Sequence, residues 1–383
     1  MPALTDLPYM FKIKYLISKQ ASLIHATTIA LLTTHAIILF SCQARAAEVI
    51  DQRGKALSLP RAVERAVFLP MPAPSTFIAI DQDERRIAGM NQASAAAMRD
   101  GILGRFFPGF ARIATDVTQG NTMLPNVEQI LTLNPDLVVQ WATEGDAPIA
   151  MLERAGLRVM GIRYGGQAEM AAYTALLGVA AGREGRAAEI MSRQATRQAQ
   201  LELAMAGLAA RARPGVLYLN RYNGALSVGG TDSYIDFCIR LGGGRNVAAD
   251  LPRGGRTVTV EQVLVWNPDV ILLGNFDTAM PADLYADPRL RAVAAVRDRR
   301  VYRVPLGGYR WDPPSQESAL AWTWIAGLLQ PGRLDADLRA DIRDWYRFLY
   351  GRPVDDADID GILFAAGNRG SAGYDRFVGA QRP

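Results

Sequence analysis

The apolar and polar positions of the chain form a block that occurs twice. Residues 127–131 and 260–264 both read Val-Glu-Gln-x-Leu, and Asn-Pro-Asp follows each block after two further residues. Proline removes a backbone donor and disfavours helical geometry in the residue before it, so each Asn-Pro pair ends a short helix. The apolar runs that follow, 137–139 and 270–273, predict buried parallel strands. The spacing of 133 residues is too long for a solenoid repeat and predicts two similar domains in tandem.

Further apolar runs predict the other strands of these domains, at 66–69, 157–162, 216–219 and 300–304. Segments with helical spacing alternate with them, and this alternation is typical of α/β domains with mainly parallel sheets.

A long polar segment with helical spacing separates the two domains. Residues 186–211 contain no proline before Pro214 and a single glycine, and their apolar positions recur near one helical face. A helix of this length extends about 39 Å and can bridge two domains, although a helix packed within one lobe has the same pattern. A second amphipathic helix is predicted over 335–349, before a turn-rich tail that begins at Gly351.

The first 47 residues have the composition of a secretory signal peptide. Lysines precede an apolar stretch over 23–40, and Ala44-Arg45-Ala46 supplies a small-residue cleavage site. This segment predicts export to the periplasm. Two alternatives stay open, which are retention as a membrane anchor and lipid attachment at Cys42. The predicted organisation is a signal peptide over 1–47, an N-terminal α/β lobe over 48–185, a linker helix over 186–211, a C-terminal α/β lobe over 212–330, and a C-terminal helix and tail over 331–383.

Removal of the signal peptide changes what chemistry the chain can perform. The 383 residues carry a formal charge of +4 and two histidines, His25 and His35, which both lie in this segment. Without them the mature chain has no imidazole for general-base catalysis, for a Ser-His-Asp triad or for zinc ligation. The remaining acids and arginines are interspersed, which excludes the charge pattern of nucleic-acid binding. We therefore expect no enzyme activity, no catalytic residue and no metal held by the protein alone.

The order of these elements, together with three sequence motifs, resembles a known family. The motifs are the doubled Val-Glu-Gln block, Leu241-Gly242-Gly243-Gly244-Arg245-Asn246-Val247, and Arg303-Val304-Pro305. Over residues 48–350 the chain resembles the periplasmic binding proteins of ABC importers for ferric siderophores, haem and cobalamin. The resemblance implies two α/β lobes joined by a single long helix, with a ligand cleft between the lobes. It also implies a monomer that delivers its ligand to an ABC permease in the inner membrane.

The resemblance further implies one docking residue on each lobe. In that family, a glutamate of each lobe docks onto arginines of the permease, and the repeat matches these glutamates to Glu128 and Glu261. The alternative is local, because the helix dipole stabilises a glutamate in the first turn of a helix by about 0.3–1 kcal/mol.

Candidate ligand-binding residues follow the predicted strands. Trp141 falls where cobalamin-binding relatives place a tryptophan in the cleft, and ligands collect at the strand ends of α/β sheets. Loops after other strands add aromatic rings and guanidinium groups, which offer stacking faces and hydrogen-bond donors. The candidates are Asn91, Trp141, Arg221, Tyr222, Tyr309, Arg310 and Trp311. Structural alternatives stay open: Trp141 in the core, Tyr222 in a turn, or Arg310 paired with Asp312.

These residue types favour a large anionic metal chelate as the ligand. Relatives that bind naked zinc or manganese use imidazoles and carboxylates, so a metal would arrive inside its chelator. Arginine matches carboxylate and oxyanion acceptors, which predicts a ferric siderophore or related iron chelate and no resident cofactor. The alternatives are haem, with Tyr222 or Tyr309 as axial ligand, cobalamin, and a bare oxyanion. An enzyme such as a chelatase would need His or Cys ligands that the mature chain lacks.

Overall fold

The computed structural model describes residues 47–59, 62–120, 122–142, 146–251 and 255–379. The cleavage site and Cys42 lie outside these residues, so the signal peptide and the lipid attachment stay predictions. Within the described ranges, no helix is long and apolar enough to span a membrane.

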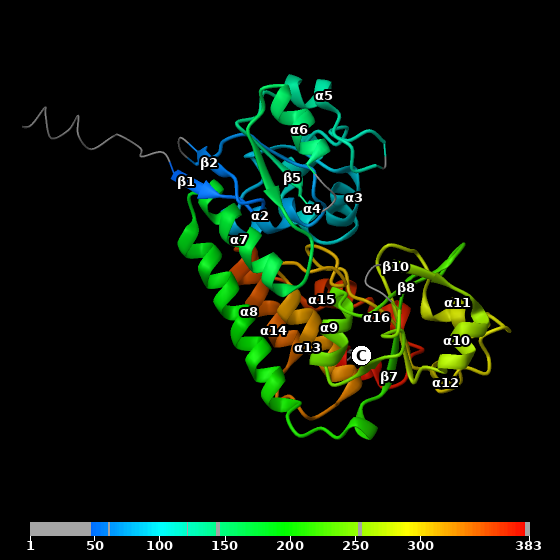
Figure 1. Ribbon diagram of the computed structural model, residues 1–383. Helices are drawn as coiled ribbons and strands as arrows, with labels where there is room; N and C mark the ends of the chain where they lie inside the picture. The colour runs from blue at the N-terminus through cyan, green and yellow to red at the C-terminus, as the bar shows by residue number, and fades with distance from the viewer. Residues whose placement is uncertain (1–46, 60–61, 121, 143–145, 252–254, 380–383) are drawn as a thin grey trace, which may run out of the picture. The chain divides into compact units, whose positions relative to one another are not determined.

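The N-terminal lobe is built on a four-stranded parallel sheet in the order β4-β3-β5-β6 (Figure 1). An antiparallel hairpin, β1-β2, precedes the sheet, and the Asp51 carboxylate ties it to β6 by accepting the Gly161 N–H at 2.8 Å. The strands are β1 (Ala47–Ile50), β2 (Ala56–Leu59), β3 (Ala66–Phe68), β4 (Ile87–Met90), β5 (Leu137–Trp141) and β6 (Val159–Ile162). The helices are α2 (Ala73–Asp81), α3 (Gln92–Asp100), α4 (Leu103–Phe106), the 3-10 turn η1 (Pro108–Arg112), α5 (Val127–Thr132), α6 (Ala147–Arg154) and α7 (Gln167–Ala181).

The C-terminal lobe has a mixed sheet in the order β10-β8-β7-β11-β12. Strands β7, β11 and β12 are parallel, short β9 joins β7 in parallel, and β8 and β10 form an antiparallel edge. The strands are β7 (Gly215–Arg221), β8 (Leu226–Gly229), β9 (Arg245–Asn246), β10 (Gly255–Val258), β11 (Val270–Leu273) and β12 (Val301–Arg303). The helices are α9 (Tyr234–Leu241), α10 (Val260–Trp266), α11 (Pro281–Ala286), α12 (Ala294–Arg297) and α13 (Ser318–Leu329). Every strand predicted from the sequence is present, and the α/β fold with mainly parallel sheets is confirmed.

The sequence repeat forms the same local structure in both lobes. Helices α5 and α10 begin at equivalent caps, where the Asn126 side chain accepts the Gln129 N–H and the Thr259 hydroxyl accepts the Gln262 N–H. Each helix then buries one apolar residue, Ile130 or Val263.

The Asn-Pro-Asp motif connects each helix to the following strand. Asn134 and Asn267 adopt left-handed φ values of 45° and 41°, which asparagine tolerates better than most residues. Asp136 then accepts the backbone N–H groups of Glu64 and Arg65, and Asp269 accepts that of Gly215. The motif therefore reverses the chain and fixes β5 and β11 beside the first strand of their lobes.

Helix α8 (Glu184–Ala204) is the predicted linker helix, and it ends at Ala204 rather than at 211. Gly207 lies just beyond it with a φ of 70°, a left-handed conformation that stops a helix, and the 3-10 turn η2 (Ala210–Ala212) follows. Helix α8 packs against α7 and against α13 (Figure 1). The buried Gln194 side chain donates to the carbonyl oxygens of Ser315 and Gln316 at 3.0 and 3.1 Å.

Each sheet buries both of its faces, because alternate side chains of a strand point to opposite sides. In β5, Val139 joins a large core that continues into the C-terminal lobe, whereas Val138 joins a smaller core of its own lobe. In β11, Leu272 enters the same large core, and Ile271 packs on the opposite face. The two lobes are therefore joined by shared apolar packing as well as by α8.

The chain after the C-terminal lobe is more ordered than the turn-rich tail expected from the sequence. Helix α14 is followed by short helical elements that cover β12, the edge strand of the sheet. The Asn368 side chain accepts the Arg303 N–H at 2.7 Å and donates to the Arg303 carbonyl oxygen at 3.1 Å, as a neighbouring strand would. These elements are α14 (Leu338–Tyr350), α15 (Asp356–Ile362), α16 (Ala365–Asn368) and the 3-10 turn η3 (Tyr374–Phe377).

Candidate ligand-binding site

The sequence-predicted ligand residues lie at the carboxyl ends of the parallel strands. In the N-terminal lobe, Asn91 follows β4 and Trp141 ends β5; in the C-terminal lobe, Arg221 ends β7 and the 304–312 loop follows β12. In parallel sheets these ends share one edge, where α/β proteins bind their ligands.

An aromatic pair marks this edge in the N-terminal lobe. Trp141 is partly buried and meets Tyr164, on the loop after β6, edge-to-face with ring centres 5.8 Å apart. Tyr164 is 49% exposed. Asn91 is buried, and its side-chain oxygen caps α3 by accepting the Ala93 N–H at 2.7 Å. Trp141 and Tyr164 therefore offer ring surface to a ligand, whereas the Asn91 side-chain oxygen is already used to cap α3.

The Tyr164 phenol also influences the electrostatics of two tyrosines of the C-terminal lobe. Burial raises the pKa of Tyr309 to about 12, and the nearby Tyr164 phenol contributes to the increase. Burial likewise raises the pKa of Tyr218, on β7, with a further contribution from Tyr164. Tyr164 was not among the residues predicted from the sequence, although it follows a predicted strand in the same way as Trp141.

Arg310 is a partly buried cation at this edge in the C-terminal lobe. Its guanidinium donates to the Asn275 carbonyl oxygen at 3.3 Å and lies 4.6 Å from the centre of the Phe276 ring. Among the described residues, no carboxylate lies within ion-pair distance of it. The alternative of an Arg310–Asp312 pair is not formed, because Asp312 instead accepts the Tyr218 hydroxyl at 2.8 Å and the Asn275 N–H at 2.7 Å.

A buried carboxyl group holds the loop that carries Arg310. Glu317 is fully buried and accepts four hydrogen bonds. The Gly308 N–H and the Tyr350 hydroxyl donate to Oε1 at 2.9 and 2.5 Å, and the Trp311 indole N–H and the Tyr346 hydroxyl donate to Oε2 at 2.6 and 3.0 Å. Trp311, a predicted ligand residue, is thus buried in the packing of its own loop, and its contact with a ligand stays a prediction.

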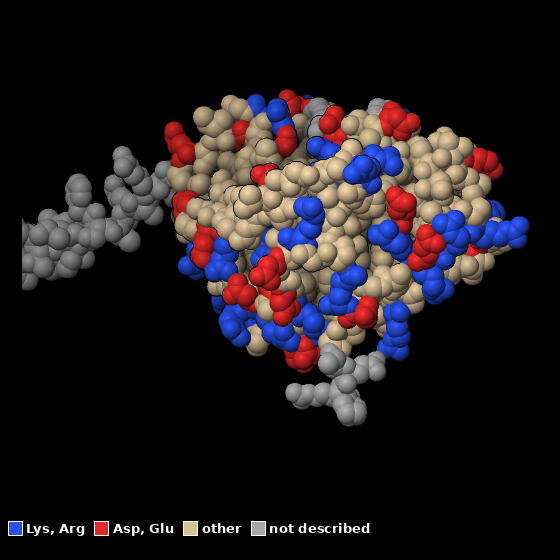
Figure 2. Space-filling model, turned by 90° about the horizontal axis from the view of Figure 1, so that it is seen from below, with Lys and Arg blue, Asp and Glu red and all other residues tan. Residues whose placement is uncertain are grey.

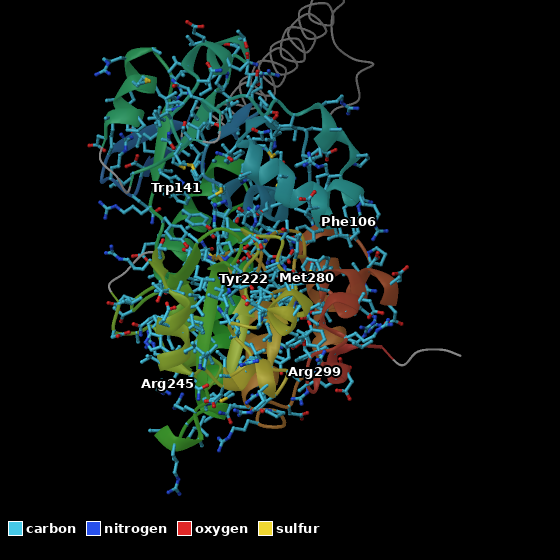
Figure 3. The ribbon with its side chains drawn as sticks, turned by 90° about the vertical axis from the view of Figure 1, so that its right-hand side faces the viewer. Phe106, Trp141, Tyr222, Arg245, Met280 and Arg299 are labelled. Atoms are coloured by element: carbon cyan, nitrogen blue, oxygen red, sulfur yellow. The ribbon has the colours of Figure 1, made fainter. Side chains whose placement is uncertain are left out.

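The other two candidates lie at the end of β7. Tyr222 packs against the core on the far face of its own sheet, and its hydroxyl donates to Asp287 at 2.6 Å. Burial raises its pKa to about 12, with Asp287 adding to the increase. Arg221 is exposed. Figure 3 shows Trp141 in the N-terminal lobe and Tyr222 in the C-terminal lobe. The contacts of Tyr222 with Asp287 and with the core thus stabilise the loop that carries it.

The two candidate docking residues occupy matching positions. Glu128 and Glu261 are exposed in the first turns of α5 and α10, and neither carboxylate lies within ion-pair distance of a basic group in the described part of the chain. Hydrogen bonds from its own N–H and from Thr259 lower the pKa of Glu261, which keeps it ionised at neutral pH.

Comparison with known proteins identifies the family. The sequence profile described as "Periplasmic binding protein" matches residues 94–306, more than half of the chain. This chain belongs to the periplasmic binding protein family. The match includes both copies of the repeat and strands β5, β6, β7 and β12, whereas Asn91 and Arg310 lie outside it.

Three relatives illustrate how far the similarity of this periplasmic binding protein extends. A periplasmic solute binding protein from Veillonella parvula has a similar structure, with a TM-score of 0.78, 28% identity, and coverage of 85% of this chain and 99% of the other. The molybdate-binding protein MolA of Haemophilus influenzae is 32% identical over 130 residues, which cover 33% of this chain and 37% of MolA. A cobalamin-binding protein of Halobacterium salinarum is 28% identical over 231 residues, 55% of this chain and 60% of the relative. The chain thus spans about a third to three-fifths of the length of the curated relatives it matches.

The family agrees with the expectation that the chain is not an enzyme, because periplasmic binding proteins bind solutes and do not transform them. Within the described residues, no group of three or more His, Cys, Asp or Glu side chains is placed to hold a metal ion.

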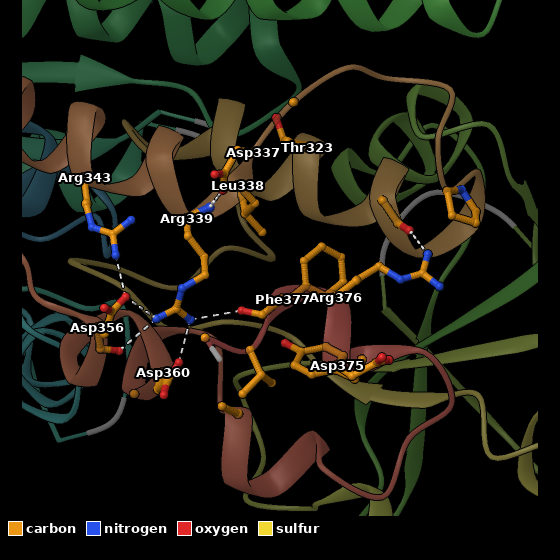
Figure 4. Close-up of a pocket in the computed structure, with 18 of the residues that line it drawn as sticks. Thr323, Asp337, Leu338, Arg339, Arg343, Asp356, Asp360, Asp375, Arg376 and Phe377 are labelled. Atoms are coloured by element: carbon orange, nitrogen blue, oxygen red, sulfur yellow. Dashed lines mark hydrogen bonds and ion pairs between the residues drawn. The ribbon is translucent and has the colours of Figure 1, made fainter. Parts of the chain in front are cut away.

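A cavity of about 1800 Å³ lies elsewhere in this periplasmic binding protein, between α13, α14 and the elements after α14 (Figure 4). Two of its arginines, Arg339 and Arg343, are paired with carboxylates, whereas Arg376 donates to the Gly373 and Gly327 carbonyl oxygens. Arg339 contacts Asp360 and Asp356 at 2.5 and 2.7 Å, and Arg343 also contacts Asp356. On the face in Figure 2, acidic and basic side chains are interspersed. Among the described residues, Arg310 therefore differs from Arg339 and Arg343 in having no carboxylate partner.

The buried carboxyl group of Glu317 predicts a pH-dependent stability. Burial raises its pKa above the ordinary value of 4.5, so the unfolded chain releases this proton at a lower pH than the folded chain does. As the pH rises from about 4.5 toward the folded pKa, the free energy of unfolding should decrease. Urea unfolding of Glu317→Gln between pH 4.5 and 8 should lack this decrease. Glu48→Gln, at an exposed position, is the matched control and should keep the wild-type slope; equal slopes for Glu317→Gln and wild type would contradict the assignment.

Proposed function

We propose that the chain is the substrate-binding component of an ABC importer and that it captures an anionic ferric chelate. The observation that carries this proposal is Arg310, a partly buried cation at the strand ends with no carboxylate partner among the described residues. The guanidinium also donates to the Tyr309 hydroxyl at 3.4 Å, and its remaining N–H groups can bind a carboxylate or oxyanion of a ligand.

The aromatic residues favour a chelate over a bare ion. Trp141 and Tyr164 from one lobe, and Phe276 beside Arg310 in the other, offer ring surface that an organic chelator can cover. A small oxyanion needs hydrogen-bond donors but no such surface.

Haem is a weaker alternative because its tyrosine ligand would have to lose a proton. Burial raises the pKa of Tyr309 and of Tyr222 to about 12, and the Tyr222 hydroxyl is bonded to Asp287. Iron ligation by either phenolate is therefore costly near neutral pH. Cobalamin remains an alternative through the similarity to the Halobacterium protein.

A bare oxyanion is the second candidate. Its support is the 32% identity to the molybdate-binding protein of Haemophilus influenzae over 130 residues. Arg310 would supply donors to a tetrahedral anion in the same place.

We infer that the signal peptide directs the protein to the periplasm, where it works as a monomer, and that Cys42 becomes an alternative lipid anchor if cleavage occurs before it. The exposed Glu128 and Glu261 then dock the loaded protein onto the permease.

Tryptophan fluorescence of the chain from Ala47 onward tests the ligand class. Titration with ferric siderophores, ferric citrate, haemin, cobalamin and molybdate should give saturable quenching with one anionic ferric chelate. Arg310→Gln should weaken that binding by about 10- to 100-fold, the effect of losing a charge-assisted hydrogen bond of about 1.5–3 kcal/mol. Arg154→Gln, at an exposed position on α6, is the matched control. Binding that is unaffected by Arg310→Gln would contradict the assigned site, and saturation by molybdate instead would select the second candidate.

Charge reversal tests the docking residues. Glu128→Lys and Glu261→Lys should each weaken binding to the importer's permease by more than about tenfold, because like charges then face each other across the interface. Ligand affinity should stay unchanged, since both positions lie outside the candidate ligand site. Glu184→Lys, at an exposed position on α8, is the control. Normal docking and uptake by the double variant would refute the role of the two glutamates.

A further inference from the structure

We propose that an exposed leucine beside each docking glutamate, Leu131 and Leu264, forms the apolar half of a two-part docking surface. This inference rests on the proposed docking of the two glutamates. The partner would present two similar sites, each with a basic side chain next to an apolar patch.

The two leucines occupy equivalent positions and are both exposed. Leu131 is 46% exposed on α5, and Leu264 is 37% exposed on α10. Each lies three residues after its glutamate, and residues three apart lie on the same side of a helix. Each lobe therefore presents a carboxylate and a leucine side by side, and Figure 1 shows α5 and α10 each on the outside of its own lobe.

Other positions of the repeat have a structural role in the fold, but Leu131 and Leu264 do not. Asn126 and Thr259 cap the helices, and Asp136 and Asp269 fix the neighbouring strands. The leucines, by contrast, contribute little to either core.

Some packing positions differ between the two copies of the repeat, although Val127 and Val260 are identical. Ile130 in one copy is Val263 in the other, and Leu133 is Trp266. The exposed Glu and Leu are identical in both. A single exposed leucine needs no explanation, but the same exposed pair at matching positions of two lobes indicates a shared role in binding.

The chemistry of the pair defines the partner. An ionised carboxylate with no basic neighbour within ion-pair distance in the described residues is complemented by Arg or Lys, and an exposed leucine by an apolar pocket. Because the pair occurs twice, the matching surface must also occur twice, as in a partner made of two like subunits or halves. An ABC permease with two transmembrane halves has this form.

The test is the affinity of purified variants for the importer's permease–ATPase complex in lipid nanodiscs. Leu131→Ser and Leu264→Ser should each weaken binding about tenfold, and the double variant about a hundredfold, because each loses the burial of one leucine. Leu203→Ser on α8 is the matched control, since Leu203 is 79% exposed but has no counterpart in the repeat; it should bind within twofold of wild type. Ligand affinity and melting temperature should be unchanged in all of these variants.

The possible results distinguish the role of the two leucines from that of the two glutamates. If the double leucine variant binds like wild type while Glu128→Lys/Glu261→Lys loses binding, the apolar half is refuted and the glutamates stand. If Leu203→Ser weakens binding as much as the repeat variants do, the assignment to matched positions is also refuted. If the wild-type chain does not bind the complex, both the docking and its apolar half are overturned.

Discussion

The buried carboxyl group of Glu317 fixes where the loop with Arg310 can lie. It gathers hydrogen bonds from the loop itself, through Gly308 and Trp311, and from α14, through Tyr346 and Tyr350. A side chain on Gly307 or Gly308 would collide with this network, which explains the paired glycines. If the loop moved away, the buried Glu317 carboxyl group and its donors would lose their hydrogen-bond partners, which costs free energy. The loop therefore has little freedom to move independently.

The same network connects the ligand loop to the N-terminal lobe. The Phe106 ring packs against Tyr346 and Tyr350, and the Ile102 N–H donates to the Gly307 carbonyl oxygen at 3.0 Å. With the apolar core that the two lobes share, these contacts limit how far the lobes can separate before apolar surface is exposed. These contacts between the lobes therefore favour small movements over a wide opening.

Much of the architecture could be predicted because it depends on local patterns. Apolar runs after Asn-Pro-Asp gave strands β5 and β11, and the duplicated block gave two lobes. The site was predicted less well, because strand-end position says where a side chain begins but not which way it turns. Trp141 and Arg310 lie at the expected edge, whereas Trp311 is directed to Glu317 and Tyr222 to Asp287.

The missed features depend on contacts between residues far apart in the sequence. Glu317 and Tyr350 are separated by 33 positions. A periodic pattern of apolar residues does not predict a buried hydrogen-bond network between positions so far apart. The order of the C-terminal tail was missed for the same reason, because Asn368 pairs with the backbone of Arg303 across 65 positions. Tyr164 differs from these, since the rule that selected Trp141 also applies to the loop after β6.

The most direct test of the account is the position of the metal in crystals grown with a bound ferric chelate or with molybdate, located by the anomalous scattering of iron or molybdenum. We expect a single site beside Arg310 that also contacts Trp141 and Tyr164. A metal located instead in the cavity lined by Arg339, Arg343 and Arg376 would contradict it.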